Sequence, residues 1–214
     1  MGGMSAQVIA KANPKEVNEK ALAGVKKDKE RELDQGNDGA WVAHPSLVEP
    51  VKNIFEKNFK GPNQLNKFNN EKINRRDLLD EPKFDNAITE LGVRENLNEG
   101  IEYMAFWIIG LGCCIVNYLM ADAATCEVSR AQLWVWLKYK VKLDDGRIID
   151  EKLIDKLIED ELNKIKKRFV AWKERTGDKS LDLVSFESAA KIFKDMMTKE
   201  NFDDFLTLPL YEKI

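Results

Sequence analysis

Apolar residues recur every three or four positions through most of the second half of the chain, which is the period of an amphipathic helix. The longest such segment spans residues 151–175. Its opposite face is rich in Lys and Glu, as expected of a surface in contact with water. The predicted buried face carries Leu153, Ile154, Leu157, Ile158, Leu162, Ile165, Phe169 and Trp172. Further helices are predicted over residues 96–109, 123–140, 183–198 and, as a short one, 201–206.

The start of the chain predicts a strand followed by a helix. Residues 1–11 are apolar and contain two glycines, which suits one short strand or a loop leaving one. Asn13 then offers a helix cap, Pro14 suits the first helical turn, and Glu16 completes a capping-box pattern. The glycine-containing turn at residues 36–39 ends this predicted helix.

A second strand and a second helix are predicted next. The continuous apolar run at residues 40–44 lies between that turn and a proline, which is typical of a strand buried on both faces. Ser46 and Glu49 form another capping-box pattern, which predicts a helix to about residue 58. The order strand, helix, strand, helix is typical of a parallel α/β fold. Because two strands leave apolar edges unpaired, this segment is predicted to be part of a larger sheet.

Composition narrows the class of protein. The chain has 43% hydrophobic and 33% charged residues, which is ordinary for a folded, soluble protein. Its 34 basic and 37 acidic residues nearly balance, so nucleic acid is not an expected partner. The apolar run at residues 104–120 is interrupted and short for a bilayer span, so it is assigned to the core. Three cysteines without a C-x-x-C pair and a single histidine favour a reduced, intracellular setting over a zinc site.

The most informative stretch surrounds Asp122, which directly precedes a predicted helix. One interpretation is an N-cap, whose carboxylate accepts hydrogen bonds from the first helical turn. The other is a partly desolvated carboxylate that takes a proton as a general base. The two roles conflict, because a helix N-terminus stabilises the ionised carboxylate. A base would need apolar cover from Tyr118 and Leu119, or a cap supplied by Thr125 instead. The apolar positions predicted to bury this helix are Ala124, Val128, Ala131, Trp134 and Leu137.

Two longer motifs resemble the C-terminal region of malate synthases. Residues 118–136 are Y-L-M-A-D-A-A-T-C-E-V-S-R-A-Q-L-W-V-W, and residues 88–103 are I-T-E-L-G-V-R-E-N-L-N-E-G-I-E-Y. The resemblance extends to G-G-M-S-A-Q, D-K-E-R-E-L and W-V-A-H-P before them and to F-L-T-L-P after them. It covers nearly the whole chain, which looks like the last two-fifths of such an enzyme.

The resemblance implies a mainly α fold. Residues 1–60 would be the last β/α units of a TIM barrel, residues 61–76 a linker, and residues 77–214 an all-helical C-terminal domain that carries the catalytic aspartate. Malate synthases condense acetyl-CoA with glyoxylate to malate and CoA in the glyoxylate cycle, which joins the tricarboxylic acid cycle. In this family an aspartate removes a proton from the acetyl methyl group, an arginine stabilises the enolate, and Mg²⁺ held by two carboxylates polarises glyoxylate.

By this resemblance Asp122 matches the catalytic base, while Pro45 and Cys113 match positions near the bound acetyl-CoA. The arginine and the Mg²⁺ ligands match barrel strands that precede Met1. The implied partners are therefore acetyl-CoA, glyoxylate and the missing N-terminal barrel, with no nucleic acid and no membrane. The isolated chain is expected to be inactive. The alternative is a non-catalytic helical scaffold or interaction module derived from the same domain.

The sequence departs from the family beside the expected cavity. Ile109, Leu111 and Ile115 replace the usual arginine, asparagine and proline, and Ala121 replaces the acidic residue that usually precedes the base. These replacements put the activity of the parent enzyme in question. A cytoplasmic location is expected, because the C-terminus lacks an S-K-L type peroxisomal address. A glyoxysomal location is the alternative.

Overall fold

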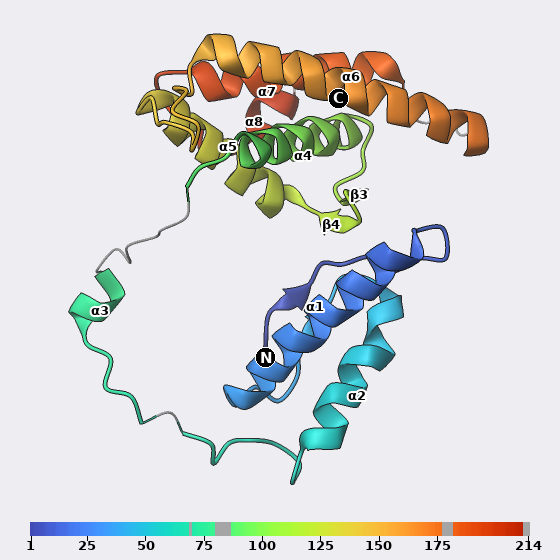
Figure 1. The fold of residues 1–214 in the computed structure, drawn as a ribbon, viewed down its shortest axis with the longest axis vertical. Helices are drawn as coiled ribbons and strands as arrows, with labels where there is room; N and C mark the ends of the chain where they lie inside the picture. Colours follow the sequence, from blue (N-terminus) through green and yellow to red (C-terminus); the bar gives the residue numbers. More distant parts are fainter. Residues whose placement is uncertain (69, 80–86, 177–181, 212–214) are drawn as a thin grey trace. The chain divides into compact units, whose positions relative to one another are not determined.

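The computed structural model describes residues 1–68, 70–79, 87–176 and 182–211. Within these residues the chain divides into two compact units (Figure 1). Unit 1 comprises Met1–Phe84 with Asn117–Met120, and unit 2 comprises Asp85–Val116 with Ala121–Ile214. The C-terminal residues 212–214, considered above for a targeting signal, lie outside the described residues. None of the helices in the described part of the chain combines the length and apolar character that a bilayer span needs.

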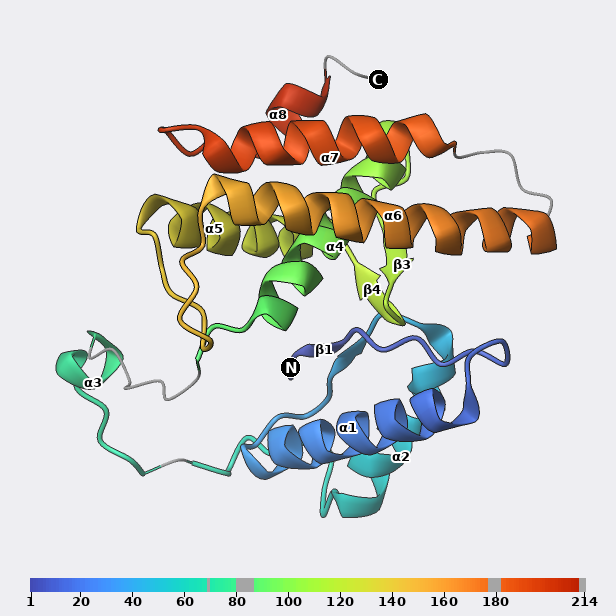
Figure 2. The ribbon, with the colours of Figure 1, turned by 45° about the horizontal axis from the view of Figure 1, so that its top comes forward.

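Unit 1 has the predicted order of strand, helix, strand, helix. Its two short strands pair in parallel, with Met4 opposite Trp41 and Ser5 opposite Val42. The helices α1 and α2 lie side by side (Figures 1 and 2). Its elements are β1 (Met4–Ser5), α1 (Lys15–Asp34), β2 (Trp41–Val42), the 3₁₀ helix η1 (Pro45–Leu47), α2 (Val48–Asn58) and the short α3 (Arg75–Leu79).

The strands of unit 1 are shorter and more exposed than predicted. β2 contains only Trp41 and Val42, and Trp41 is 62% exposed. The prediction of a strand buried on both faces is therefore wrong for this residue. Val42 packs against the small core of the unit, whereas the residues described for unit 1 leave the face of Trp41 uncovered. That core consists of Val25, Leu33, Leu47, Val51 and Phe55.

Neither predicted capping box forms in unit 1. α1 begins after Pro14 without a side-chain cap, and the side-chain Nδ2 of Asn13 instead donates to the carbonyl of Val8 (2.8 Å). At the second site the ring of His44 accepts a hydrogen bond from the amide of Ser46 (3.2 Å). This bond begins the 3₁₀ turn η1, so α2 starts two residues later than Ser46 and has no side-chain cap of its own.

Two buried charges connect α1 with Gly3, the residue before β1. The fully buried Lys29 donates from Nζ to the carbonyl of Gly3 (2.6 Å) and to both carboxylate oxygens of Glu32 (3.0 Å each). Glu32 accepts a hydrogen bond from the amide of Gly3 (2.8 Å). Both backbone groups of Gly3 are thus satisfied by side chains of α1. Burial of these charges is tolerable because each is paired and hydrogen-bonded.

The segment after β1 has a partner that the sequence did not predict. The amide of Val8 donates to the carbonyl of Tyr118 (2.9 Å), and the amide of Met120 donates to the carbonyl of Ala6 (2.7 Å). These bonds add the turn residues Asn117–Met120 to unit 1 as an antiparallel neighbour. One edge of this segment is therefore covered within the chain.

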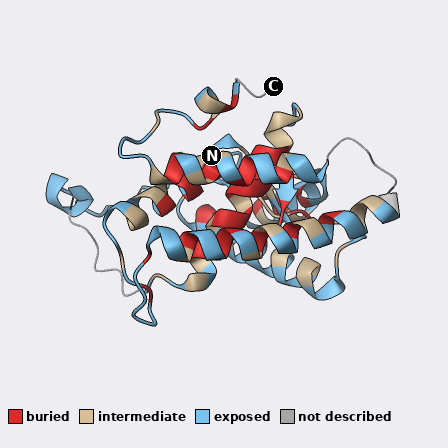
Figure 3. Ribbon diagram, turned by 90° about the horizontal axis from the view of Figure 1, so that it is seen from above, coloured by how far each residue is buried: buried red, intermediate tan, exposed pale blue. Residues whose placement is uncertain are grey.

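Unit 2 is a helical bundle built around α4. This helix contacts α5, α6 and α7 (Figure 2). Figure 3 shows the buried residues of these helices facing inward. Its elements are α4 (Glu90–Ile108), β3 (Cys114–Val116), β4 (Leu119–Ala121), α5 (Ala123–Lys138), α6 (Glu151–Thr176), α7 (Leu183–Thr198) and α8 (Thr207–Leu210).

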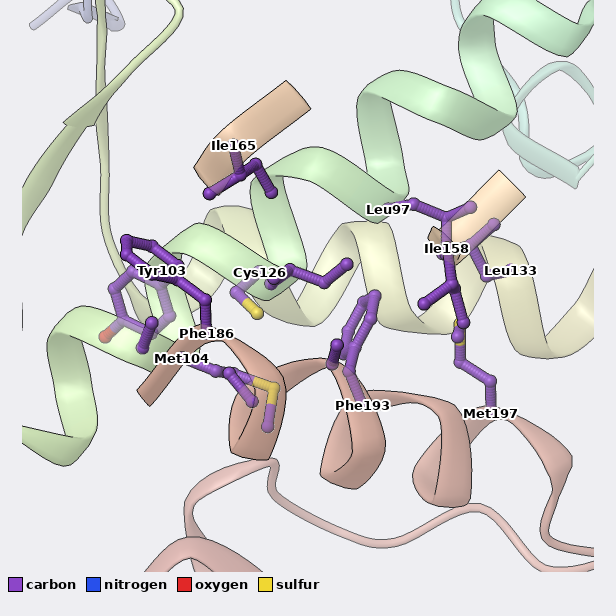
Figure 4. Packing of buried hydrophobic residues seen from close by; sticks show 14 of the residues in the cluster. Leu97, Tyr103, Met104, Cys126, Leu133, Ile158, Ile165, Phe186, Phe193 and Met197 are labelled. Atoms are coloured by element: carbon purple, nitrogen blue, oxygen red, sulfur yellow. The ribbon is translucent and has the colours of Figure 1, made fainter. Parts of the chain in front are cut away.

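The core of unit 2 allows a close approach of α4 and α7. Phe193 of α7 points toward α4 among the buried side chains (Figure 4). A Cβ atom at Gly100 would overlap the ring of Phe193, so glycine is required at that position of α4. Leu97 and Met104, one turn to either side on α4, are also fully buried. The predicted apolar face of α6 is confirmed, since Ile154, Leu157, Ile158, Ile165 and Phe169 are buried.

Helix boundaries in unit 2 agree with the predictions to different degrees. α7 has the predicted bounds, while α4 starts six residues earlier than predicted. The reason is a cap that the prediction overlooked, because Oγ1 of Thr89 accepts from the amide of Gly92 (3.0 Å). The short helix predicted at residues 201–206 is wrong. Residues 199–205 are irregular there, and α8 begins at Thr207.

The predicted buried face of α5 is wrong for two of its five residues, whereas Leu137 packs partly buried against the core. Ala124 and Val128 are exposed, with Val128 at 57%, whereas Ser129 and Arg130 are buried with Leu133. Apolar periodicity placed the core on the opposite side, because it counts a polar residue as solvent-facing. Here a serine and an arginine occupy the interior of the bundle. The contacts that allow this burial come from the C-terminal segment of the chain.

Between α4 and α5, within the apolar run that the sequence assigned to the core, the chain forms a β-hairpin that was not predicted. β3 and β4 pair as a two-stranded sheet. The two turn residues, Asn117 and Tyr118, have φ values of 47° and 65°. Positive φ at both central positions is characteristic of a type I′ turn, which suits two-residue hairpins. Asn commonly adopts this conformation, whereas Tyr does so rarely.

Candidate functional site

Asp122 caps α5. Its backbone is extended, and Oδ1 accepts hydrogen bonds from the amide of Thr125 (3.1 Å) and from the hydroxyl of Thr125 (3.2 Å). The amide of Asp122 donates to Oγ1 of Thr125 (3.4 Å), which completes a reciprocal capping box. The N-cap interpretation is therefore confirmed. Thr125 shares the cap with Asp122 and does not replace it.

The cap occupies only one oxygen of the carboxylate. Oδ2 of Asp122 forms no hydrogen bond with any residue in the described part of the chain, and the side chain is half-buried. Tyr118 and Leu119 do not provide the expected apolar cover, since they are 44% and 42% exposed. Instead the fully buried Ala121 precedes the carboxylate. One oxygen is thus held in place while the other can still accept a proton.

Tyr103 on α4 is a buried polar neighbour of this region that the sequence analysis did not single out. Its ring is buried, and its hydroxyl donates to the carbonyl of Gly112 (3.2 Å). The pKa of Tyr103 is raised to about 12, first by burial and then by neighbouring groups that include Asp122 and Cys113. The phenol is thus bonded to the residue that precedes Cys113, and the charge of Asp122 acts on it. The only available signal was its place in the motif that ends in I-E-Y.

The three cysteines are free thiols in different surroundings. Cys113 is exposed, while Cys114 and Cys126 are buried. Burial is the main cause that raises the pKa of Cys114 to about 12, and burial also raises the pKa of Cys126. Because the thiolate is the reactive form, the raised pKa makes the two buried thiols unreactive. Cys113 is the accessible thiol of the three. Beside it Leu111 and Ile115, two of the aliphatic replacements, are exposed to solvent.

Glu99 and Glu102 are two acidic residues whose electrostatics bear on the question of a metal site. Burial, and next the charge of Asp122, raise the pKa of the half-buried Glu99. Burial also raises the pKa of Glu102, although its ion pair with Arg168 partly offsets this effect. Within the described residues, no group of three or more His, Cys, Asp or Glu side chains could hold a metal ion. The site can accept a proton, but the residues present do not fit Mg²⁺.

Pro45 lies in unit 1, at the first position of η1 and three residues after β2 ends at Val42. The proline is exposed, and the buried Leu47 anchors the same turn in the core of unit 1. A hydrogen bond between the ring of His44 and the hydroxyl of Ser46 (2.7 Å) holds the turn from its outer side. Pro45 therefore occupies a solvent-facing turn after the carboxyl end of a parallel strand.

Comparisons with known proteins cover both units. A family model described as the malate synthase TIM barrel domain matches residues 1–81, and one described as the malate synthase C-terminal domain matches residues 87–214. The chain is 41% identical to a malate synthase of Myxococcus xanthus and 38% identical to a glyoxysomal malate synthase of Candida tropicalis. The matches span 100% of this chain but only 38% and 37% of those relatives. A bifunctional glyoxylate cycle protein of Caenorhabditis elegans is 38% identical, and 21% of its length is matched.

Proposed function

Since the chain belongs to the malate synthase family, we propose that it forms the C-terminal portion of an enzyme that condenses acetyl-CoA with glyoxylate. Asp122 takes a proton from the acetyl methyl group. The carbon left with the electron pair then attacks the glyoxylate carbonyl, and hydrolysis of the thioester yields malate and CoA. Residues 1–60 supply the last barrel units, residues 61–76 the linker, and residues 77–214 the domain that carries the base.

The free Oδ2 of Asp122 carries this proposal. A general base needs an acceptor oxygen that is positioned but not already used. The capping box with Thr125 holds Oδ1, which orients the carboxylate without occupying Oδ2. Because the two functions fall on different oxygens, Asp122 can serve as cap and base together. This division relieves the competition for hydrogen bonds, while the helix N-terminus still stabilises the ionised carboxylate.

The other catalytic groups of the family, the arginine and the Mg²⁺ ligands, are not assigned to residues of this chain. The described residues do not fit Mg²⁺, so we assign no step to the metal. The enolate also needs electrostatic stabilisation as it forms. We propose that the Mg²⁺ ligands and the group that stabilises the enolate come from barrel segments outside this chain. These segments are then its principal partner. The isolated chain would consequently bind no productive acetyl-CoA and glyoxylate pair and would show no turnover.

Pro45 and Cys113 are proposed to line the path of acetyl-CoA. Both are exposed in their own units, so either can meet a ligand without prior rearrangement. Cys113 directly follows Gly112, whose carbonyl accepts from the hydroxyl of Tyr103, and this supports its place in the same region as Asp122. We propose a cytoplasmic location, with a glyoxysomal one as the alternative, since glyoxysomal enzymes are among the relatives.

The test uses Asp122→Asn in the enzyme assembled from this chain and the preceding barrel segments. Asparagine is also a good N-cap, so α5 should keep its stability while the base is lost. We expect the release of CoA thiol from acetyl-CoA and glyoxylate to fall at least about a thousandfold. Thermal unfolding of the variant, which should be unchanged, is the control. Activity within tenfold of the parent would contradict the assignment.

A second measurement applies the same thiol assay to the isolated chain. No turnover is expected, and clear turnover would refute the proposal that catalytic groups lie elsewhere. The non-catalytic scaffold is favoured by one observation, the closed helical core of unit 2. That alternative requires Asp122→Asn to leave every function of the assembled protein unaffected, so the first experiment separates the two.

A further inference from the structure

Residues 199–206, here called the brace, follow α7 and run along α5 in an irregular conformation. The brace is held through its backbone by side chains of α5. Nε1 of Trp134 donates to the carbonyl of Lys199 (2.9 Å), and Nζ of Lys138 donates to the carbonyl of Glu200 (3.5 Å). These bonds satisfy carbonyl groups that the brace does not use in a helix of its own.

The other end of the brace is held by an earlier turn of α5. Nη2 of Arg130 donates to the carbonyl of Asp203 (2.9 Å), and the amide of Leu206 donates to Oε1 of Glu127 (2.6 Å). The ring of Phe202 lies on the guanidinium of Arg130, 3.9 Å from its carbon to the ring centroid. The brace therefore runs antiparallel to α5, and its contacts follow one face of that helix at intervals of three or four residues.

An ion pair between Glu127 and Arg130 connects these contacts with one another. Nε and Nη2 of Arg130 donate to Oε2 of Glu127 (2.8 and 2.5 Å), while Oε1 remains for the brace. Arg130 is only 1% exposed. Removing one partner of a buried ion pair leaves an uncompensated charge, so the two residues depend on each other. This pair explains why α5 turns a charged position toward the interior.

We propose that Glu127 and Arg130 are positioning residues for Asp122. The inference rests on the proposed function, in which Asp122 is the base. Asp122 begins the same helix, about 7.5 Å along the axis from Glu127 at about 1.5 Å per residue. By fixing the rotation of α5 about its axis, the brace sets the direction in which Oδ2 points. A displacement of about 1 Å at a reacting group can cost about a hundredfold in rate.

The first test needs no catalysis and uses the full 214-residue chain. Glu127→Gln keeps an oxygen for Leu206 but removes the charge that binds Arg130. We expect it to shift the carboxyl ¹³C resonance of Asp122 and to speed amide exchange at Thr125 at least about tenfold. Exchange in the middle of α6, such as at Ile158, should not change. The matched control is Lys194→Ala, which breaks an exposed ion pair with Asp155.

Trp134→Phe is a milder variant, because it removes one bond to the brace and retains an aromatic ring. It should shift the Asp122 resonance in the same direction by a smaller amount. The inference is overturned if exchange in the brace rises while the Asp122 resonance and Thr125 exchange stay at their parent values. It is also overturned if Lys194→Ala produces the same changes, since the response would then report general loosening.

The second test is kinetic and uses the enzyme assembled with its barrel segments. Arg130→Lys should lower kcat about 10- to 100-fold while the KM for glyoxylate changes less than about threefold. A loss for Asp122→Asn together with parent kcat for Arg130→Lys would refute the positioning role alone. If Asp122→Asn is harmless, the proposed function fails, whereas the resonance shift in the isolated chain remains a valid measure of positioning.

Discussion

The two units differ in how they cover their apolar side chains. Unit 2 draws buried residues from four long helices into one core, and its central helix α4 is covered by α5, α6 and α7. Unit 1 has a small core from α1, α2 and their connections, and it exposes Trp41 and Met4 on its two strands. Unit 2 therefore has an extensive core of its own, whereas unit 1 exposes apolar side chains of its strands, as a fragment of a larger sheet would.

Helix caps show the same contrast. In unit 2, α4, α5 and α7 are capped by the side chains of Thr89, Asp122 and Asp182. In unit 1, α1 and α2 have no side-chain caps. Capping is a local interaction that stabilises a helix before tertiary packing. The helices of unit 1 depend more on tertiary contacts such as those of Lys29.

The largest expected effect comes from emptying the core of unit 2. Phe193→Ala removes a fully buried ring that fills the space above Gly100. We expect the free energy of unfolding of unit 2 to fall by about 3–5 kcal/mol. Urea unfolding followed by far-ultraviolet circular dichroism measures this loss. Phe55→Ala in unit 1 is the matched control and should leave that main transition in place. Equal shifts for both variants would show that the units unfold as one.

The next effect concerns the buried charges of unit 1. Lys29→Met leaves the carboxylate of Glu32 buried without its cation, so α1 should lose about 3 kcal/mol of stability. Native-state amide exchange in α1 measures this change. The double variant Lys29→Met, Glu32→Met removes both charges and should recover most of the loss. If the single and double variants are equally unstable, packing rather than charge decides the stability of unit 1.

A third prediction compares adjacent thiols of unit 2. With a pKa of about 12, Cys114 has on the order of one thiolate per ten thousand molecules at pH 8. Cys113 is exposed and should react with iodoacetamide roughly a hundredfold faster. Because burial raises the pKa of Cys114, its thiolate population should keep increasing as the pH rises toward 12. Peptide mass spectrometry measures both labelling rates. Equal rates at pH 8 would contradict the burial of Cys114.

The smallest effect tests the caps directly. Thr89→Ala removes the hydroxyl that caps α4 and should cost about 1 kcal/mol. Ser46→Ala changes the residue that the sequence predicted as the cap of α2, but its hydroxyl bonds only to the ring of His44. We expect a loss below about 0.5 kcal/mol for this variant. Thermal unfolding measures both variants. A larger loss of stability for Ser46→Ala than for Thr89→Ala would show that Ser46 does cap α2, as the sequence predicted.

Much of unit 2 was predictable because its signals are local. The bounds of α7 and the buried face of α6 follow from apolar residues at helical spacing, which requires no knowledge of distant segments. Asp122 was found for the same reason, since a cap and its helix are neighbours in sequence. Thr89 was overlooked although its capping signal was present. The apolar positions used to place the start of α4 began six residues further on.

The site was predictable only in part. A motif singled out Asp122 and Cys113, whose roles stay predictions. It did not single out Tyr103, because a single tyrosine in a helix carries no signal of what surrounds it. The free Oδ2 of Asp122 could not be foreseen either. A capping pattern names the residue that caps a helix, but it does not say which oxygen is used.

By itself the sequence determined the family, the order of strands and helices, and the position of the candidate base, because each depends on residues close together along the chain. Only the tertiary structure decided which face of α5 is buried. That choice depends on Arg130 finding the backbone of residues 199–206, about 70 positions away. A buried guanidinium is tolerated where distant partners meet it, and apolar periodicity contains no record of such partners.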